Sequence, residues 1–322
     1  MIAYTVRRLF VAVPIVFLAT LIVFLLVSAR GDPLADERRR VGVSEQAIEA
    51  RERQYHLDRS KPVQYGLWVR DFATGDWGRS FESGRSVRTM IADAAGNTAI
   101  LVGAAAAVSI VVALTAGTFA AVRRGRFGDH AVNGASAFGI AMPEFWFALL
   151  LQLVLVVWLE RWSGLDLFDT RGMYSPGREG DLVDLVRHLV LPALALTVTN
   201  VAIWTRVHRD RMIDALGGEH LDTARAAGVP ERRIIGRHAV RSSLGPFVTV
   251  VAVDVGLLLG GVVVVERIFA WPGLGWVFIN ALDDHDYPVL LAWMTVAAVF
   301  VVVANVVGDL VSAMLDPRVR LG

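Results

Sequence analysis

Long apolar stretches alternate with charged segments along the whole sequence. A helix that crosses a bilayer needs roughly 20 mainly apolar residues, because lipid satisfies none of its backbone polar groups. Six stretches meet this requirement, and we therefore expect an all-α integral membrane protein with six transmembrane helices. The expected spans are residues 9–29, 94–122, 131–159, 189–205, 246–265 and 287–311.

The distribution of arginine predicts the orientation of these spans. Short cytoplasmic loops of membrane proteins carry an excess of basic residues. Arg7 and Arg8 precede the first span, three arginines separate the second span from the third, and eight lie between residues 206 and 241. Arg318 and Arg320 agree with this pattern, so both termini are expected in the cytoplasm. The first apolar run is longer than the roughly 7–15 residues of a signal peptide, and we interpret it as a retained anchor.

Two segments are expected outside the membrane. Residues 160–187 are rich in glycine and proline, which break helices, so no regular structure is predicted there. Residues 30–93 are composed like a small folded element that packs on the membrane domain, and a solvated amphipathic loop is the alternative. In that segment Pro62 suits the start of a helix, and the large side chains that fall on one face of it are Tyr65, Trp68, Val69 and Phe72.

The loop at residues 206–245 is too polar for lipid and too long for a simple connector. It is predicted to form two helices, the first ending at Gly228 and the second running from Pro230 to Arg241. Small side chains in the first helix would let another surface approach the backbone, and arginines would bind acidic groups on a partner. An ordinary amphipathic surface hairpin is the alternative. The small residues are Ala224, Ala226 and Ala227, and the arginines are Arg225, Arg232, Arg233 and Arg237.

Composition narrows the possible functions. The chain has 32 basic and 31 acidic residues, which leaves a net charge of +1 and argues against nucleic-acid binding. It has no cysteine, which excludes disulfides, thiolate metal sites and thiol nucleophiles. Lys61 is the only lysine and is followed by proline, so the chain cannot contain a phosphate-binding loop. His-Glu-x-x-His is absent from the sequence and Ser136 lacks a Gly-x-Ser-x-Gly frame, so no catalytic or metal-binding residue is predicted.

Short motifs in a fixed order are similar to those of one transporter family. Residues 222–228, followed by Arg237-His238-Ala239, resemble the "EAA" motif with which permease subunits of binding-protein-dependent ATP-binding-cassette importers dock on their ATPases. Along nearly its whole length the chain resembles the first ("B-type") permease of oligopeptide and dipeptide importers. Other similar motifs are Gly31-Asp32-Pro33, Leu57-Asp58-Arg59, Pro62-Val63-Gln64-Tyr65, Gly75-Asp76-Trp77-Gly78, Pro143-Glu144-Phe145-Trp146, Leu191-Pro192-Ala193-Leu194 and Asp286-Tyr287-Pro288.

This resemblance implies the type I importer permease fold, a multi-pass location in the bacterial plasma (inner) membrane, and peptide as the transported substrate. The implied partners are a second permease, two ATPase domains that bind ATP and Mg, and an extracytoplasmic peptide-binding protein. The chain itself would be non-catalytic and would hold no cofactor. The implied ATPase-coupling residues are Asp222, which replaces the family's glutamate, with Thr223, Ala224, Arg225, Ala226, Ala227, Gly228, Arg232 and Arg237.

The same resemblance divides the chain into four parts. An N-terminal transmembrane helix (1–29) precedes an extracytoplasmic insertion (30–93), a permease core of five spans (94–313) and a cytoplasmic tail (314–322). In this family an outer hairpin after the fifth span helps to close the extracytoplasmic gate. The implied gate residues here are Glu266, Trp271, Pro272 and Gly273.

Acidic residues inside a membrane usually face a cavity or a partner, because charge is costly there. Asp254 in the fifth expected span is a candidate for lining the translocation path, where it would pair with a peptide amine; a structural hydrogen bond to a neighbouring helix is the alternative. Glu144 either contacts substrate or satisfies backbone groups freed at Pro143. Gly256 and Gly260 form a small-residue step suited to close packing against the partner permease.

Other functions stay open at this point. A permease of the same importer class for nickel, glutathione or sugar would have a similar sequence. An ion-coupled secondary transporter would typically show an internal repeat, and no convincing repeat is present. An intramembrane enzyme would need a nucleophile and a base at helical spacing, and a scaffold protein would also use a docking loop.

Overall fold

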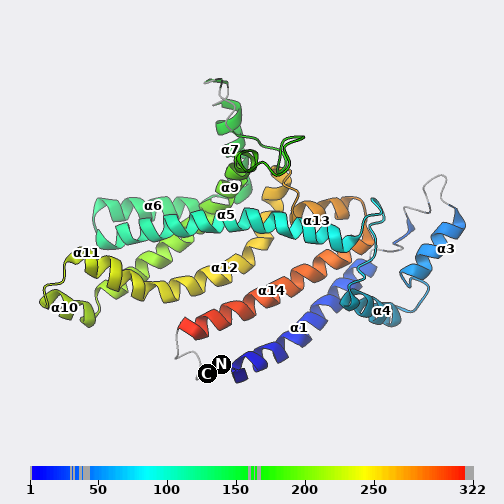
Figure 1. Ribbon diagram of the computed structural model, residues 1–322, viewed down its shortest axis with the longest axis horizontal. Helices are drawn as coiled ribbons and strands as arrows, with labels where there is room; N and C mark the ends of the chain where they lie inside the picture. The colour runs from blue at the N-terminus through cyan, green and yellow to red at the C-terminus, as the bar shows by residue number, and fades with distance from the viewer. Residues whose placement is uncertain are drawn as a thin grey trace. The chain divides into compact units, whose positions relative to one another are not determined.

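The structure is a computed structural model in which all the described regular elements are helices (Figure 1). An isolated antiparallel bridge joins Arg79 and Ser86. The described chain forms two compact units, one built mainly on residues 98–271 and the other on residues 7–97 and 272–303. The structure describes residues 2–29, 31, 33–35, 38, 44–158, 161, 162, 164 and 168–315, with the backbone alone for 2–9, 47, 220, 256–260, 304, 305 and 307–315.

Three of the described helices are long and apolar enough to cross a bilayer, or four if one bent pair counts as a single span. They are α1 (Ile2–Ser28), α5 (Val87–Val122) and α9 (Leu182–Leu216). The last two predicted spans fall within α12 (Val240–Ile268) and α14 (Tyr287–Leu315), each 29 residues long. Several side chains of both helices lie outside the described part, so a total of six spans stays a prediction.

The bent pair corrects the expectation of one continuous helix over residues 131–159. Helices α6 (Phe127–Ala141) and α7 (Glu144–Leu151) meet at an angle of 100°, and a π-helical segment, η1 (Gln152–Trp158), continues α7. Met142 and Pro143 are both extended, with ψ angles of 120° and 132°. Proline disfavours the helical region for the residue before it and donates no backbone hydrogen bond, so the helix breaks there.

Helix α9 is twice as long as the predicted span over residues 189–205. It has 35 residues and begins after Asp181, whose side chain accepts hydrogen bonds from the backbone N–H groups of Val183 and Asp184. This N-cap makes residues 182–187 helical, which corrects the expectation that 160–187 has no regular structure. At its other end α9 extends to Leu216 and takes up the first part of the expected cytoplasmic loop.

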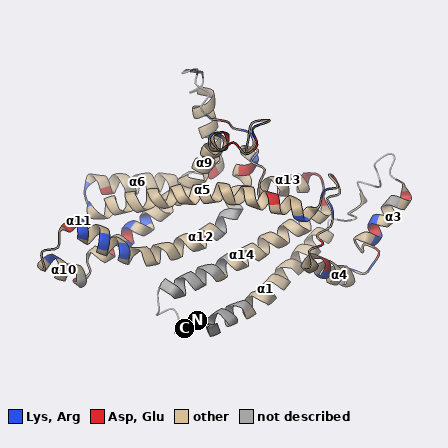
Figure 2. Ribbon diagram, in the orientation of Figure 1, with Lys and Arg blue, Asp and Glu red and all other residues tan. Residues whose placement is uncertain are grey.

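Helices α9 and α12 form the centre of the first unit. Fully buried residues of its core include Leu191 and Leu196 of α9 and Val262 and Val265 of α12. The middle parts of α5 and α9 carry no charged residue, whereas the segment around α10 (Glu219–Ala226) and α11 (Glu231–Arg233) carries many (Figure 2). This contrast is what a lipid-facing body with a water-facing end requires.

Glycines on α5 and α6 let these helices approach α9 closely. A Cβ atom on Gly117 of α5 would lie 2.9 Å from His208 Cδ2 and 3.0 Å from the Thr205 carbonyl oxygen of α9. A Cβ atom on Gly139 of α6 would lie 3.0 Å from the Ala202 Cβ. No larger residue fits at Gly117 without moving the backbone of α9.

The second unit contains α1 from Arg7 onward, α3 (Glu45–Gln54), α4 (Lys61–Thr74), α13 (Leu274–Asp283) and α14 to residue 303. Helix α4 has Pro62 in its first turn, as predicted, and ends at Gly75 in the left-handed conformation. Its Tyr65 hydroxyl lies 2.9 Å from Thr20 Oγ1 of α1. The Phe24 ring of α1 packs on Tyr65 with ring centroids 5.4 Å apart.

Buried Asp286 fixes the turn that follows α4. Its carboxylate accepts hydrogen bonds from the Ser80 hydroxyl at 2.5 Å and from the Phe81 N–H at 3.1 Å. The residues after α4 are thus attached to the start of α14, although more than 200 residues separate them in the sequence.

We expect a Gly117→Ala substitution to lower the free energy of unfolding by about 1–3 kcal/mol, because the added methyl group meets backbone atoms of α9. The matched control is Gly103→Ala on the same helix, where a Cβ atom would meet nothing within 4 Å. Denaturant titration of both variants in mixed micelles measures the difference. An equal effect of the two substitutions would contradict the close crossing.

Candidate functional site

The two helical segments predicted in the loop after the fourth expected span are present, and we call residues 217–239 the coupling hairpin after the role expected of it. Helix α10 ends in a Schellman motif: the N–H of Gly228 donates to the Arg225 carbonyl at 2.9 Å and the N–H of Val229 to the Ala224 carbonyl at 3.1 Å. Gly228 has a φ of +78°, a conformation that glycine adopts without strain. After Pro230 the chain forms α11 and the π-helical segment η2 (Ile234–Ala239), which continues into α12.

A small apolar cluster fixes the hairpin to the ends of the membrane helices. Leu221 of α10 and Ile234 of η2 are fully buried. They pack with Met212 near the end of α9 and with Ala121 near the end of α5. The hairpin is thus attached firmly to two long helices of the first unit.

All of the predicted coupling residues except Ala224, which is half-buried, are exposed on this hairpin. Arg225 binds within the hairpin, since its guanidinium lies 2.8 Å from Asp222 Oδ1 and 3.3 Å from Glu231 Oε1. Hydrogen bonds to Glu231 and then to Asp222 raise the pKa of Arg225. Arg225 therefore joins the two helices, whereas Arg232 and Arg237 are exposed at the second one.

Asp254 accepts a hydrogen bond from a neighbouring helix. The indole Nε1 of Trp204 on α9, a fully buried side chain, donates to Asp254 Oδ2 at 2.8 Å. Sequence reasoning did not find Trp204, because 50 residues separate it from Asp254 and no local pattern connects them. This bond is the structural interaction that was the alternative to a role in the translocation path.

Glu144 is the first residue of α7, directly after the bend. The Thr199 side chain of α9 lies close to its carboxylate. It also lies against Gly261 of α12, where a Cβ atom would come within 2.7 Å of Glu144 Oε2. Glu144 of α7 therefore lies close to α9 and α12 of the same unit.

The predicted gate residues lie where α12 ends. Glu266 is fully buried and accepts a hydrogen bond from the Thr98 hydroxyl of α5 at 2.6 Å. The N–H of Trp271, which is also fully buried, donates to the Glu266 carbonyl at 2.9 Å. In the second unit, Asn97 Nδ2 donates to the Pro272 carbonyl at 2.8 Å, and Gly273 precedes the short apolar helix α13.

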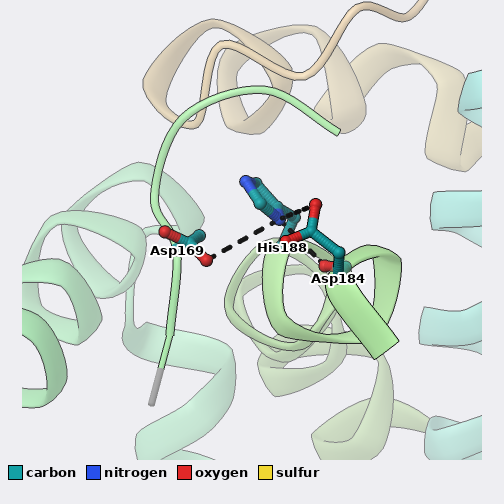
Figure 3. A group of neighbouring side chains, drawn as sticks. All are labelled: Asp169, Asp184 and His188. Atoms are coloured by element: carbon teal, nitrogen blue, oxygen red, sulfur yellow. Dashed lines mark hydrogen bonds and ion pairs between the residues drawn. The ribbon is translucent and has the colours of Figure 1, made fainter. Parts of the chain in front are cut away.

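A cluster of titratable residues at the start of α9 was not predicted. His188 lies between the carboxylates of Asp169 and Asp184, with Nδ1 3.9 Å and 3.7 Å from their Oδ2 atoms (Figure 3). These are metal-binding residue types, and their candidate ligand atoms lie within 4.8 Å of one another. However, Nδ1 of His188 is also 2.9 Å from the Asp184 carbonyl, and both oxygens of the Asp184 carboxylate accept hydrogen bonds from Ser175. We interpret the cluster as an internal network that fixes residues 168–181 to α9.

Sequence comparison shows the family to which this chain belongs. Residues 113–321 match the family described as "Binding-protein-dependent transport system inner membrane component", and the chain belongs to this family. It is 34% identical to the oligopeptide transport system permease protein AppB of Bacillus subtilis, over 99% of this chain and 100% of the relative. It is 32% identical to the dipeptide transport system permease protein DppB of Escherichia coli K12 and 33% identical to the di/tripeptide permease DppB of Pseudomonas aeruginosa, in both cases over 99% of each chain.

Replacing Trp204 by phenylalanine is expected to lower the free energy of unfolding by about 1–3 kcal/mol, because the Asp254 carboxylate then loses a buried donor. Trp146→Phe on α7 is the control, since this tryptophan is 47% exposed. Denaturant titration in mixed micelles compares the two variants. Equal stabilities would show that the bond between Trp204 and Asp254 contributes nothing measurable.

Proposed function

We propose that this chain is the transmembrane permease subunit of an ATP-driven peptide importer. The observation that carries this proposal is the near full-length similarity to curated oligopeptide, dipeptide and di/tripeptide permeases. Its several apolar helices agree with a multi-pass protein of the inner membrane. The coupling hairpin supplies the exposed surface that such a subunit needs on its cytoplasmic side.

In this proposal the chain transmits motion and does not hydrolyse ATP. Two ATPase domains bind ATP and Mg and dock on the coupling hairpin. A second, similar permease completes the translocation path, and an extracytoplasmic binding protein delivers the peptide. Closure of the ATPases on nucleotide pushes the hairpins and opens the path outward, and hydrolysis resets it. Both chain termini then lie in the cytoplasm, as the arginine distribution predicts.

The geometry of the hairpin supports docking. Its attachment is apolar and buried at Leu221 and Ile234, so the hairpin resists bending when it is pushed. Its outer face consists of small residues at Ala226, Ala227 and Gly228, which allow the backbone to come close to a partner. A solvated surface hairpin would need no such attachment to two membrane helices.

For the path itself, Asp254 and Glu144 are the proposed polar positions on helices of the first unit. Asp254 is half-buried, and the Trp204 bond engages its Oδ2 atom. A carboxylate fixed in this way is preorganised to accept a peptide ammonium. Glu266, Trp271, Pro272 and Gly273 are proposed to act at the outer gate.

We expect Gly228→Asp to abolish co-purification of the ATPase subunits in detergent, because it adds a charged side chain to the turn that must approach the partner. The matched control is Gly84→Asp, since Gly84 also has a positive φ, +67°, and also lies in open space. Gly84 belongs to the turn after α4 and not to the hairpin. Retained ATPase binding by the Gly228 variant, or no ATPase bound by the wild type, would contradict the proposal.

If Asp254 contacts the peptide amine, Asp254→Asn should lower the uptake of peptides with a free N-terminus about tenfold. The asparagine side chain still offers an oxygen to Trp204, so the fold is expected to persist. N-acetylated peptides, which lack the ammonium group, serve as the control substrates. Uptake of both peptide sets at the wild-type level would leave Asp254 with a structural role only.

A further inference from the structure

A buried ion pair that the proposed function does not use lies at the cytoplasmic end of the membrane helices. Arg209 of α9 donates from Nε to Asp129 Oδ1 at 2.6 Å and from Nη2 to Asp129 Oδ2 at 2.8 Å. Asp129 belongs to the first turn of α6. The two side chains are only 17% and 4% exposed. This two-point geometry fixes the orientation of both groups as well as their distance.

Asp129 also binds the turn that joins α5 to α6. Its Oδ2 atom accepts a hydrogen bond from the Gly125 N–H at 2.9 Å, and its Oδ1 atom accepts one from Asn133 Nδ2 at 2.8 Å. Each carboxylate oxygen thus receives two donors. Through this one side chain, α9 is attached to the turn at Gly125 and to the start of α6.

Helix α5 packs closely on α9 beside the Asp129–Arg209 pair. Gly117 of α5 packs against the backbone of Arg209, because a Cβ atom on Gly117 would lie 3.1 Å from the Arg209 backbone nitrogen. One residue further along α5, Thr118 Oγ1 lies 3.0 Å from Nε2 of His208. The cytoplasmic end of α9 therefore has little freedom to slide or rotate against α5 and α6.

The coupling hairpin begins only a short distance further along α9. Met212, three residues after Arg209, packs with Leu221 of α10 and Ile234 of η2. A displacement of the hairpin therefore reaches α9 through Met212, and the next fixed point along α9 is the ion pair at Arg209.

We infer that the Asp129–Arg209 pair is the rigid joint through which displacement of the coupling hairpin moves α5 and α6 together with α9. This inference rests on the proposed function and assigns a positioning role to two residues that contact neither nucleotide nor substrate. Arg209 also donates from Nη1 to the exposed Asp210 Oδ1 at 2.8 Å. A buried ion pair suits this role, because removing Arg209 leaves the Asp129 carboxylate buried without its charged partner. An exposed ion pair separates and exchanges its partner for water at little cost in free energy, so it transmits little displacement between helices.

The same helix provides an exposed pair for comparison. Arg211 lies 4.0 Å from Asp214, and these side chains are 52% and 74% exposed. Arg211→Gln therefore removes an arginine and an ion pair from the same end of α9 without touching the joint. It is the matched control for Arg209→Gln.

The test uses the complete complex with both permeases, the ATPases and the binding protein in liposomes. Peptide uptake and ATP hydrolysis are measured for wild type, Asp129→Asn, Arg209→Gln, Arg209→Lys and Arg211→Gln. We expect the first two variants to lower uptake about tenfold while ATP hydrolysis stays within about twofold, so the ATP consumed per peptide rises. Arg209→Lys should recover part of the uptake, because lysine keeps the charge but lacks the two-point geometry. Arg211→Gln should match the wild type.

Three results would overturn the inference. The first is wild-type uptake and ATP consumption per peptide in Asp129→Asn and Arg209→Gln. The second is a parallel loss of uptake and hydrolysis with a lower unfolding midpoint, which is the result of a purely structural role. The third is an equal effect of Arg211→Gln. Co-purification of the ATPases with every variant separates these results from a failure of the proposed function, in which no ATPase binds even the wild type.

Discussion

The exclusion of water from lipid determines how this chain uses its polar residues, because each buried polar group must find its partner inside the protein. Helix α12 shows how this requirement is met. Asp254 accepts from the Trp204 indole, and Glu266 accepts from the Thr98 hydroxyl. Both donors come from other helices of the same unit. Burying each acid costs desolvation free energy unless its hydrogen-bond partner is in place. Each acid therefore favours the one arrangement of neighbouring helices in which its donor is within reach.

The attachment of the coupling hairpin is of a different kind. Apolar residues, Leu221 and Ile234 among them, bury the inner side of the hairpin against the ends of α5 and α9. Apolar packing is non-directional, so on its own it would allow small rotations. The nearby Asp129–Arg209 pair fixes the orientation of α9 relative to α6, because its two parallel hydrogen bonds tolerate little rotation.

Features governed by local rules could be predicted from the sequence. Long apolar runs indicated where apolar helices occur, Gly228 indicated the end of a helix, and Pro62 indicated the start of another. The 100° bend at Met142 and Pro143 has a local cause, but its size depends on how α7 packs on α9. The ends of α9 were misjudged because residues 206–216 are too polar to indicate a span, and their partners, such as Asp129, are far away in the sequence.

The same division holds for the candidate site. The expected coupling residues were identified by short motifs, and Asp254 and Glu144 were noticeable as acids in apolar surroundings. Trp204 and Thr98 carried no signal, since an indole or a hydroxyl is common in membrane helices. Their importance arises only from contacts over 50 to 168 residues.

The internal position of Arg225 has a consequence for how the hairpin meets a partner. Its positive charge is paired within the hairpin with two carboxylates, those of Asp222 and Glu231, so Arg225 adds little positive potential outside. In the proposed docking, long-range attraction would then come from exposed arginines such as Arg232 and Arg237, and it would weaken as ionic strength rises. Contact at the small residues near Gly228 would depend on shape and would respond little to salt. The proposed encounter and the proposed final fit would thus depend on different residues of the same hairpin.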